Sequence, residues 1–327
     1  MTTGVHPWRK PLRRAFRRAV RLAALAAVGG LALTAVAALA GVGHRAPDLL
    51  AQFAAPAFVG ALVLLAALVL LRRRRLAGGA AAATAALLLA VWPQWFPPQG
   101  EPGPGAPGVR IYAANLWARN RDVDAIAASI RAADADILVL IEVGDAPAAR
   151  LDAILAGYPH RVASRRIERS SGAARSVIAA RWPLAPIPDR PDGLHALGAI
   201  AETPLGPVNV VGVHLTRPWP FQEQWGQISQ TMALADLRRS LRGPVVVAGD
   251  FNSVSTARIG RQMKAQTGLV PASGWPGSWP AAAPAPLRIN IDQVWRSPDL
   301  ALTRRRLGAP TGSDHRPVVV EITPAAG

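Results

Sequence analysis

Residues 244–252 read PVVVAGDFN, and this stretch decides how the second half of the chain folds. A proline followed by a short run of β-branched and small apolar residues predicts a strand buried on both faces. The run ends on a carboxylate, Asp250, and an amide, Asn252. Polar residues at such a strand end stay accessible at the edge of a sheet, where functional residues gather. The stretch therefore predicts a sheet whose strand ends carry chemically active side chains.

Similar apolar runs occur on both sides of this strand. We predict strands at residues 109–115, 137–143, 176–180, 197–202, 208–214, 289–295 and 316–322, and helices at 122–133 and 222–241. Many strands with few helices between them favour an α+β sandwich with a mixed sheet over a regular strand–helix–strand series.

Most of these strands also end on, or follow, a polar residue. The residues are Asn115, Glu142, His214, Asp250, Asn252 and Asp292, with Asp314 and His315 just before the last strand. If these ends converge, they form an oxygen-rich site, and Mg²⁺ prefers oxygen ligands. Zinc would require more histidines or cysteines, and the chain has no cysteine. We therefore expect Mg²⁺, with Mn²⁺ as the alternative ion.

A series of motifs carries a family resemblance. The motifs are NLW (115–117), LVLIEV (138–143), GVHL (212–215), GDFNS (249–253), IDQVW (291–295) and SDHRP (313–317). In order and spacing they resemble those of the endonuclease/exonuclease/phosphatase superfamily, which includes DNase I-like nucleases, inositol polyphosphate phosphatases and neutral sphingomyelinases. The resemblance covers residues 109–322. It implies a four-layer α/β sandwich of the DNase I-like type and Mg²⁺-dependent cleavage of a P–O bond.

The resemblance also implies a role for each polar residue. Glu142 would be the main metal ligand, and Asp314 would complete the metal coordination. Asn115 would help to bind the metal or the phosphate. Asp250 would orient or deprotonate the attacking water, and Asp292 would orient His315. Asn252 and His315 would contact the phosphate. His214 would contact a non-bridging phosphate oxygen or act as an acid.

Each of these residues also has a purely structural interpretation. Asp250 with Asn252 could form an Asx turn, and the SDH motif could form a turn before the last strand. Glu142 could be an exposed acid at a strand end, Asn115 could cap a helix or turn, and His214 could be a hydrogen-bonded core histidine. Asp292 could form an ion pair with Arg288 or Arg296. Similarly, Arg304 to Arg306 could be a solvated charge run or a patch that faces phosphate.

The first 96 residues predict a membrane anchor. Apolar runs at about 22–42, 49–71 and 76–92 are each near the roughly 20 residues needed to span a bilayer. Residues 1–100 carry twelve bases and one acid, and two basic clusters, before residue 22 and at 72–75, would both face the cytoplasm. We therefore expect a multi-pass protein of the cytoplasmic membrane with a cytoplasmic N-terminus.

The remaining chain would then lie outside the cytoplasm. Residues 97–108 form a Pro/Gly linker, and residues 109–327 form the catalytic domain. The net charge beyond residue 100 is only +6 of the total +17, so the high charge of the chain mainly reflects membrane topology. The high total charge therefore does not by itself indicate a nucleic-acid binder, and the remaining +6 would suit any phosphate-bearing substrate.

Two loops are rich in tryptophan and rim the expected site. They carry Trp219, Trp225, Trp275 and Trp279. Exposed tryptophans next to a bilayer suit contact with lipid, although they could also fill a loop core or stack on nucleobases. We therefore expect the bilayer and a phosphate-bearing substrate as partners, with a lipid-linked phosphate favoured over nucleic acid and no protein partner. The alternatives are an extracytoplasmic nuclease and a non-catalytic membrane scaffold.

Overall fold

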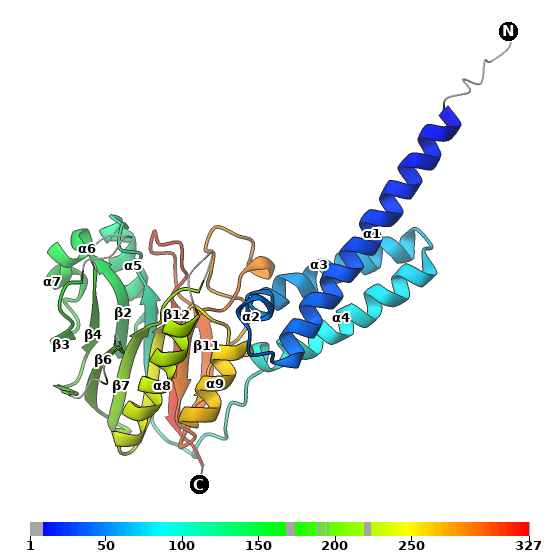
Figure 1. Ribbon diagram of the computed structural model, residues 1–327. Helices are drawn as coiled ribbons and strands as arrows, with labels where there is room; N and C mark the ends of the chain where they lie inside the picture. The colour runs from blue at the N-terminus through cyan, green and yellow to red at the C-terminus, as the bar shows by residue number, and fades with distance from the viewer. Residues whose placement is uncertain are drawn as a thin grey trace.

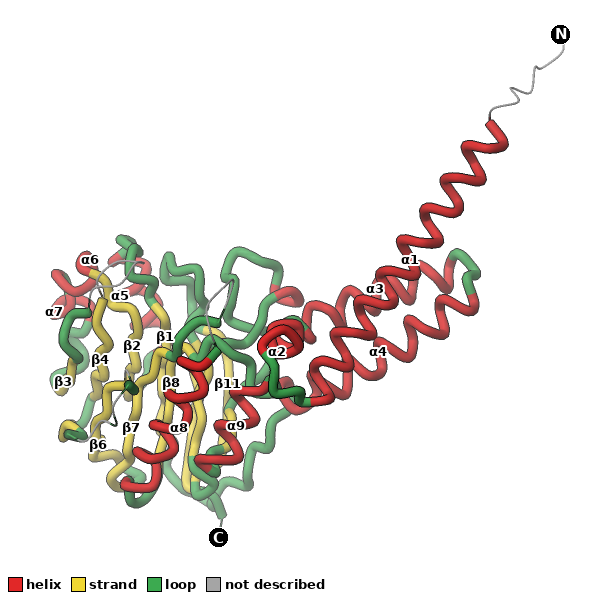
Figure 2. Tube along the Cα trace, in the orientation of Figure 1, coloured by secondary structure: helices red, strands yellow, loops and turns green. Residues whose placement is uncertain are grey.

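The computed structural model describes residues 9–167, 174–188, 191, 193–194, 196–218 and 224–326. It consists of a bundle of long helices at the N-terminus and a layered body that contains all the strands (Figure 1). Figure 2 shows that the strands lie side by side in the body and that helices and loops cover them.

Two six-stranded sheets form the centre of this body. The first has the order β11-β12-β1-β2-β4-β3, from strands β1 (Val109–Asn115), β2 (Ile137–Gly144), β3 (His160–Ala163), β4 (Ala174–Ala180), β11 (Leu300–Leu307) and β12 (Val318–Pro324). The second has the order β5-β6-β7-β8-β10-β9, from β5 (Leu184–Pro186), β6 (Ala196–Thr203), β7 (Gly206–His214), β8 (Val245–Asp250), β9 (Val270–Pro271) and β10 (Asp292–Arg296).

Helices cover the outer face of each sheet. Alternate residues of β1, β2 and β12 face the second sheet, and one buried apolar cluster joins the two sheets. The opposite residues pack under α5 (Val123–Ala133), α6 (Asp145–Ala149) and α7 (Leu151–Ile154). The second sheet packs against α8 (Trp225–Ser240) and α9 (Arg258–Thr267). The predicted α+β sandwich with two sheets is confirmed, and its layers run helix, sheet, sheet, helix.

The structure adds elements that the sequence pattern did not predict. These are β3, β5, β9, β11, α6, α7, α9 and a short 3-10 turn, η1 (Ala285–Leu287). The run Arg304 to Arg306, for which we considered a solvated charge run or a phosphate-facing patch, lies inside β11. Arg305 points inward and donates to the carbonyl of Pro276 at 2.9 Å, so it braces a loop. Its burial lowers the pKa of its guanidinium to about 10.

Gly249 allows the last residues of β8 to approach β7 closely. Its φ is +141°, and a Cβ placed there would lie 2.0 Å from the carbonyl oxygen of Val213. We expect Gly249→Ala to lower the free energy of unfolding by at least about 2 kcal/mol, because backbone strain and a steric clash add. Gly157→Ala is the matched control, since a Cβ there meets nothing within 4 Å. Equal urea midpoints for both variants would contradict this account.

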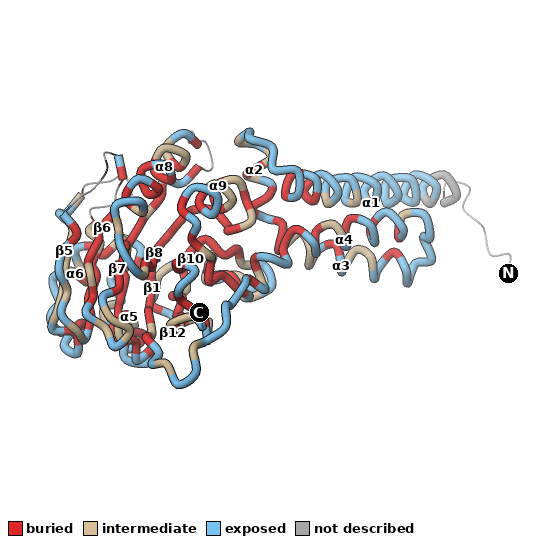
Figure 3. The backbone as a smooth tube through the Cα atoms, turned by 90° about the horizontal axis from the view of Figure 1, so that it is seen from below, coloured by how far each residue is buried: buried red, intermediate tan, exposed pale blue. Residues whose placement is uncertain are grey.

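The N-terminal bundle contains α1 (Arg9–Ala40), α2 (Arg45–Gln52), α3 (Ala54–Leu70) and α4 (Arg74–Trp95). The segments Arg14–Ala40 and Arg74–Trp95 are long and apolar enough to cross a membrane, and α2 with α3 would make a third span if the bent pair counts as one. Much of α1 is exposed along the bundle (Figure 3), including apolar side chains such as Leu33 and Val36.

Two details of this region differ from the sequence prediction. The predicted second span, 49–71, is not one helix, because α2 and α3 meet at a bend of 62°. The predicted 97–108 linker contains a turn at residues 104–105 and lies against the layered body, so it is not a free tether. The buried Arg296 donates to the carbonyl of Pro98 at 2.8 Å, and Pro102 forms a β-bridge with Ala325.

Candidate active site

Three of the predicted residues lie in one row across the second sheet. His214 at the end of β7 pairs with Asp250 at the end of the parallel strand β8. Asp250 in turn pairs with Asp292, the first residue of the antiparallel strand β10. Strand register therefore places an imidazole and two carboxylates on neighbouring strands at one edge of the sheet.

The first sheet contributes Asn115 and Glu142 to the same place. Asn115 ends β1, and its Nδ2 donates to Asp250 Oδ2 at 3.0 Å. A bulge interrupts the pairing of β2 with β4 between Leu140 and Val143, and Glu142 within it has a φ of +54°. Such conformations are strained and occur at sites where a bulge redirects a side chain. The Glu142 carboxylate is held by the amide of Ala118, which donates to Oε2 at 3.0 Å.

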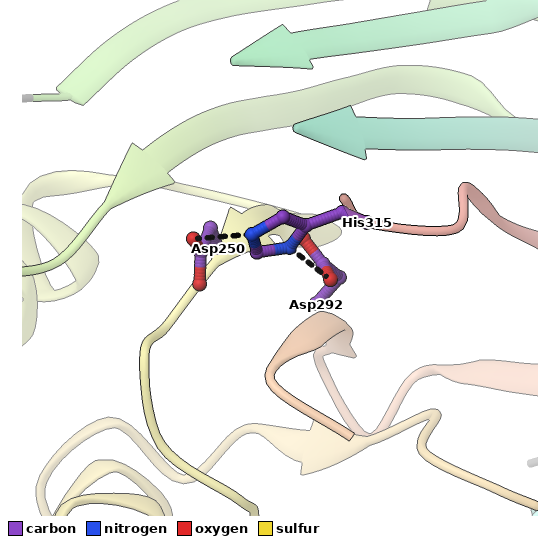
Figure 4. Close-up of side chains that lie close together, drawn as sticks. All are labelled: Asp250, Asp292 and His315. Carbon is purple, nitrogen blue, oxygen red and sulfur yellow. Dashed lines mark hydrogen bonds and ion pairs between the residues drawn. The ribbon is translucent and has the colours of Figure 1, made fainter. Parts of the chain in front are cut away.

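The loop before β12 supplies Asp314 and His315. His315 Nδ1 lies 2.8 Å from Asp292 Oδ2, and the close-up in Figure 4 shows the ring between Asp292 and Asp250. On its other side, His315 Nε2 is 4.0 Å from Asp250 Oδ2 and 3.9 Å from Asp314 Oδ1. The Asp292 carboxylate thus fixes the ring so that Nε2 faces Asp250.

His214 joins Glu142 to this group. Its Nε2 lies 3.4 Å from Glu142 Oε1 and 3.7 Å from Asp250 Oδ2. A continuous set of contacts therefore runs from Glu142 through His214, Asp250 and His315 to Asp314. These residues come from distant parts of the chain, and the structure places them side by side.

Burial and mutual charge control the protonation of the central groups. Burial, together with the nearby charge of Asp292, raises the pKa of Asp250 to about 7. Burial alone would lower the pKa of His315, but the negative charges of Asp292, Asp250 and Asp314 raise it to about 10. Burial likewise opposes ionisation of Glu142, yet His214 and the amide of Ala118 hold its pKa below the ordinary value. Near neutral pH the site thus pairs an imidazolium with a carboxyl that can take up a proton.

Asp292 should be the main control on the protonation of His315. In the metal-free protein, we expect Asp292→Asn to lower the pKa of His315 from about 10 toward 6.5, because a negative charge that favours imidazolium is lost. A ¹⁵N-resolved NMR titration of the histidine rings measures this shift. Asp299→Asn, in the exposed turn between β10 and β11, is the control. An unchanged His315 titration in Asp292→Asn would contradict the assignment.

Asn252 has a different set of contacts from the one its predicted role implies. Its backbone N–H donates to Asp250 Oδ1 at 2.8 Å, as in an Asx turn, and its φ is +47°. Its side-chain Nδ2, predicted to contact phosphate, donates to the carbonyl of Leu215 at 3.0 Å. In this structure Asn252 therefore orients Asp250 and ties the end of β7 to the loop after β8.

The tryptophans of the predicted rim fall into separate groups. Trp225 and Trp275 are exposed, by 67% and 51%. Trp279 is partly buried, and its Nε1 donates to Asp314 Oδ2 at 3.3 Å, so it is a link between helix bundle and site and not an open rim residue. Trp219 lies outside the described residues. Trp117, which we did not predict for the rim, is 39% exposed and has a φ of +59° beside Asn115.

The sequence of this domain matches the Endonuclease/Exonuclease/phosphatase family over residues 112–315. The chain belongs to this family. Family members hydrolyse phosphate esters, so the site described above is a phosphoesterase-type site. No curated protein matches the sequence.

Solved structures with the same fold support this assignment at the level of architecture. An endonuclease/exonuclease/phosphatase from Beutenbergia cavernae has a TM-score of 0.54 and 22% identity, covering 67% of this chain and 72% of that one. A family protein from Bacteroides thetaiotaomicron has a TM-score of 0.51 and 15% identity, covering 68% and 99%. The human Nocturnin catalytic domain with bound sulfate has a TM-score of 0.51 and 18% identity, covering 67% and 96%.

The residues present fit a divalent cation. The family is generally dependent on divalent metals, and Asp250, Asp292 and His315 offer ligand atoms that all lie within 4.8 Å of one another. Asp292 Oδ1 is buried and has no hydrogen-bond partner among the described residues. This tight group consists of residues predicted as catalytic. Of the predicted ligands, Asn115 bonds to Asp250 and Asp314 lies 3.9 Å from His315, whereas Glu142 meets the group through His214. Carboxylate and amide oxygens outnumber the two imidazoles, as suits a hard ion.

Proposed function

We propose that the protein is a Mg²⁺-dependent phosphoesterase of the cytoplasmic membrane that hydrolyses a lipid-linked phosphate or diphosphate. One observation carries the proposal: the helix bundle packs directly on the loops of the active site. A single buried cluster contains Ala54 and Leu87 of the bundle together with Val254 and Ile291 of the catalytic domain. Val254 follows the GDFN motif and Ile291 precedes Asp292, so the site is held next to helices with exposed apolar surfaces.

The chain's own residues can perform the hydrolysis as follows. Asp250, oriented by the Asn252 amide and by Asn115, accepts the proton of the attacking water. His315, held by Asp292, and His214 donate to phosphate oxygens on which negative charge develops. Glu142, with Asn115 and Asp314, would hold Mg²⁺, which supplies Lewis-acid stabilisation of the phosphate charge when bound. His214 is placed between Glu142 and Asp250, where it can also protonate the leaving group.

The arrangement of the basic clusters supports an extracytoplasmic site. Arg72 and Arg73 lie in the turn between α3 and α4, and Arg74 and Arg75 begin α4. Next to this turn, Leu76 and Ala77 pack beside Ala24 on α1. Both basic clusters therefore flank the bundle end that lies away from the catalytic domain (Figure 1). By the positive-inside rule this end faces the cytoplasm, and the catalytic domain lies outside.

A nuclease is the second candidate, because the fold is shared by phosphoesterases with different substrates. The net charge of +6 beyond residue 100 would assist any phosphate-bearing substrate. A non-catalytic scaffold is a weaker alternative, since all eight polar residues that the motifs predict come together at one edge.

One comparison of substrates tests the proposal. The full chain in mixed micelles, with Mg²⁺, is given a polyprenyl diphosphate, plasmid DNA and single-stranded RNA. We expect phosphate release from the lipid at a rate at least about 100-fold above that of the His315→Ala variant. Nicking of DNA at catalytic enzyme concentrations with no phosphate release would replace the lipid proposal with the nuclease. No turnover of any phosphoester, including bis(p-nitrophenyl) phosphate, would favour the scaffold.

A further inference from the structure

The short helix α2 connects the membrane-helix bundle to the catalytic loop. It presents one face to the catalytic domain: Asp48, Ala51 and Gln52, spaced at i, i+3 and i+4, are buried, whereas Leu50 is exposed. Asp48 and Gln52 are only 2% and 1% exposed. Burial of a carboxylate and an amide is costly in free energy unless both are hydrogen-bonded, so each of these side chains requires partners.

Gln52 binds the backbone directly after the GDFN motif. Its Oε1 accepts a hydrogen bond from the amide of Val254 at 2.7 Å, and its Nε2 donates to Ser253 Oγ at 3.3 Å. Asn252, which precedes Ser253, is the residue whose backbone N–H donates to Asp250 Oδ1 and so orients that carboxylate. The side chain from α2 is therefore two residues away from the backbone group that holds the proposed catalytic carboxylate.

Asp48 holds the other end of the same loop. Its Oδ1 accepts the amide of Arg258, the first residue of α9, at 2.7 Å. The neighbouring N-cap position of α9 is Ala257, which has no side chain able to cap the helix. Asp48 Oδ2 accepts from Gln224 Nε2, and Gln224 Oε1 accepts from Arg258 Nη1 at 2.9 Å. A carboxylate from the anchor thus supplies the helix cap that the catalytic domain lacks.

We propose that Asp48 and Gln52 are positioning residues for the hydrolysis, and that α2 is a functional part of the catalytic domain. Together they fix residues 253–258 at both ends, and this segment holds the Asn252–Asp250 turn in place. Small displacements of a catalytic group lower turnover strongly, so loss of this support affects the chemical step more than substrate binding. The kinetic part of this inference rests on the proposed phosphoesterase function.

The kinetic experiment uses the full chain in detergent micelles with Mg²⁺ and the soluble substrate bis(p-nitrophenyl) phosphate, so that membrane contact of the substrate plays no part. We expect Asp48→Ala and Gln52→Ala each to lower kcat by about tenfold or more, with KM changed by less than about twofold. The milder Asp48→Asn, which keeps an acceptor for the Arg258 amide, should retain more of the turnover than Asp48→Ala.

Arg261→Gln is the matched control. Arg261 lies on α9 at the same interface, and its Nη1 donates to the carbonyl of Ala38 at 3.0 Å. Among the described residues its side chain forms no hydrogen bond to the catalytic loop, and the bond from its backbone N–H to the Ala257 carbonyl is unaffected by the substitution. The kcat of Arg261→Gln should stay within about twofold of the kcat of the parent protein. An equal loss of kcat in Arg261→Gln would overturn the proposal, because the interface as a whole would then matter. A rise in KM with unchanged kcat in the α2 variants would overturn it as well.

Hydrogen exchange gives a readout that does not need activity. In Asp48→Ala and Gln52→Ala, the amides of residues 252–258 should exchange at least about tenfold faster, while those of β1 and β2 stay unchanged. If the parent protein hydrolyses no phosphoester, the proposed function fails and this measurement alone decides the positioning role. Unchanged exchange of the Val254 and Arg258 amides would overturn the inference whatever the kinetics show.

Discussion

Replacing Asp250 by Asn should lower kcat by about three to four orders of magnitude while the protein stays folded. The amide can still accept the hydrogen bond that the Asn252 backbone donates to Oδ1, so the turn after β8 is preserved. It cannot accept a proton from water. His315→Ala should have a loss of similar size, because it removes the ring that faces both Asp250 and Asp314. The measurement is the rate of phosphoester hydrolysis under saturating substrate, together with circular dichroism.

Asp236→Asn on α8 is the control for these variants, since this carboxylate is exposed and pairs only with Arg239 among the described residues. Its kcat should match that of the parent protein. If Asp250→Asn kept a turnover close to that of the control, Asp250 would not be the proton acceptor. The double variant Asp250→Asn/His315→Ala should lose little more than either single one, because residues that act together in one step are not additive.

The sequence predicted the central strands well because their apolar runs are long and end in polar residues. Strand β1 was predicted at residues 109–115 and has those bounds, and β2 extends one residue beyond the predicted 137–143. Both strands are buried on both faces, and an uninterrupted apolar run is the pattern that such strands produce. The polar residues at their ends were found for the same reason, since each one interrupts a run.

The elements that were missed lack this local pattern. Strand β11 contains Arg304 to Arg306. Three consecutive charged residues interrupt the alternation of apolar and polar residues by which a strand is recognised in a sequence. The break between α2 and α3 was also missed, because residues 49–71 look like one apolar helix. At this break, Asp48 and Gln52 form hydrogen bonds to residues about two hundred positions away, and Pro56 lies in the first turn of α3. Tertiary contacts of this kind leave no periodic signal in the sequence.

The active site likewise has features that the sequence predicts and features that it does not. Motif spacing predicted which residues meet, but not how they are held. The bond from Trp279 to Asp314 and the bond from Asn252 to Leu215 depend on the packing of loops that have no regular structure. The positive φ of Trp117 and Glu142 depends on bulges and turns that a sequence pattern does not specify. Identity of the groups was predictable, whereas their orientation was not.

Removal of divalent metal should abolish turnover, lowering it by at least about 1,000-fold, and added Mg²⁺ should restore it. The site gathers four carboxylates, Glu142, Asp250, Asp292 and Asp314, around two imidazoles. Burial and, after it, the negative charge of Asp292 raise the pKa of Asp250 to about 7, and a bound cation would offset both effects. The test is dialysis of the full chain against EDTA, followed by titration with Mg²⁺, Mn²⁺ or Ca²⁺ while hydrolysis is measured.

Glu142→Gln distinguishes a role in metal binding from a role in the chemical step. The amide keeps an oxygen that can accept the Ala118 N–H but carries no charge, so we expect the Mg²⁺ concentration for half-maximal rate to rise at least about tenfold. Saturating Mg²⁺ should then recover much of kcat. Glu321→Gln on β12, which loses only the surface ion pair with Arg110, should titrate as the parent protein does. A fall in kcat that no concentration of Mg²⁺ reverses would show instead that Glu142 acts in the reaction itself, through His214, whose Nε2 lies 3.4 Å from its carboxylate.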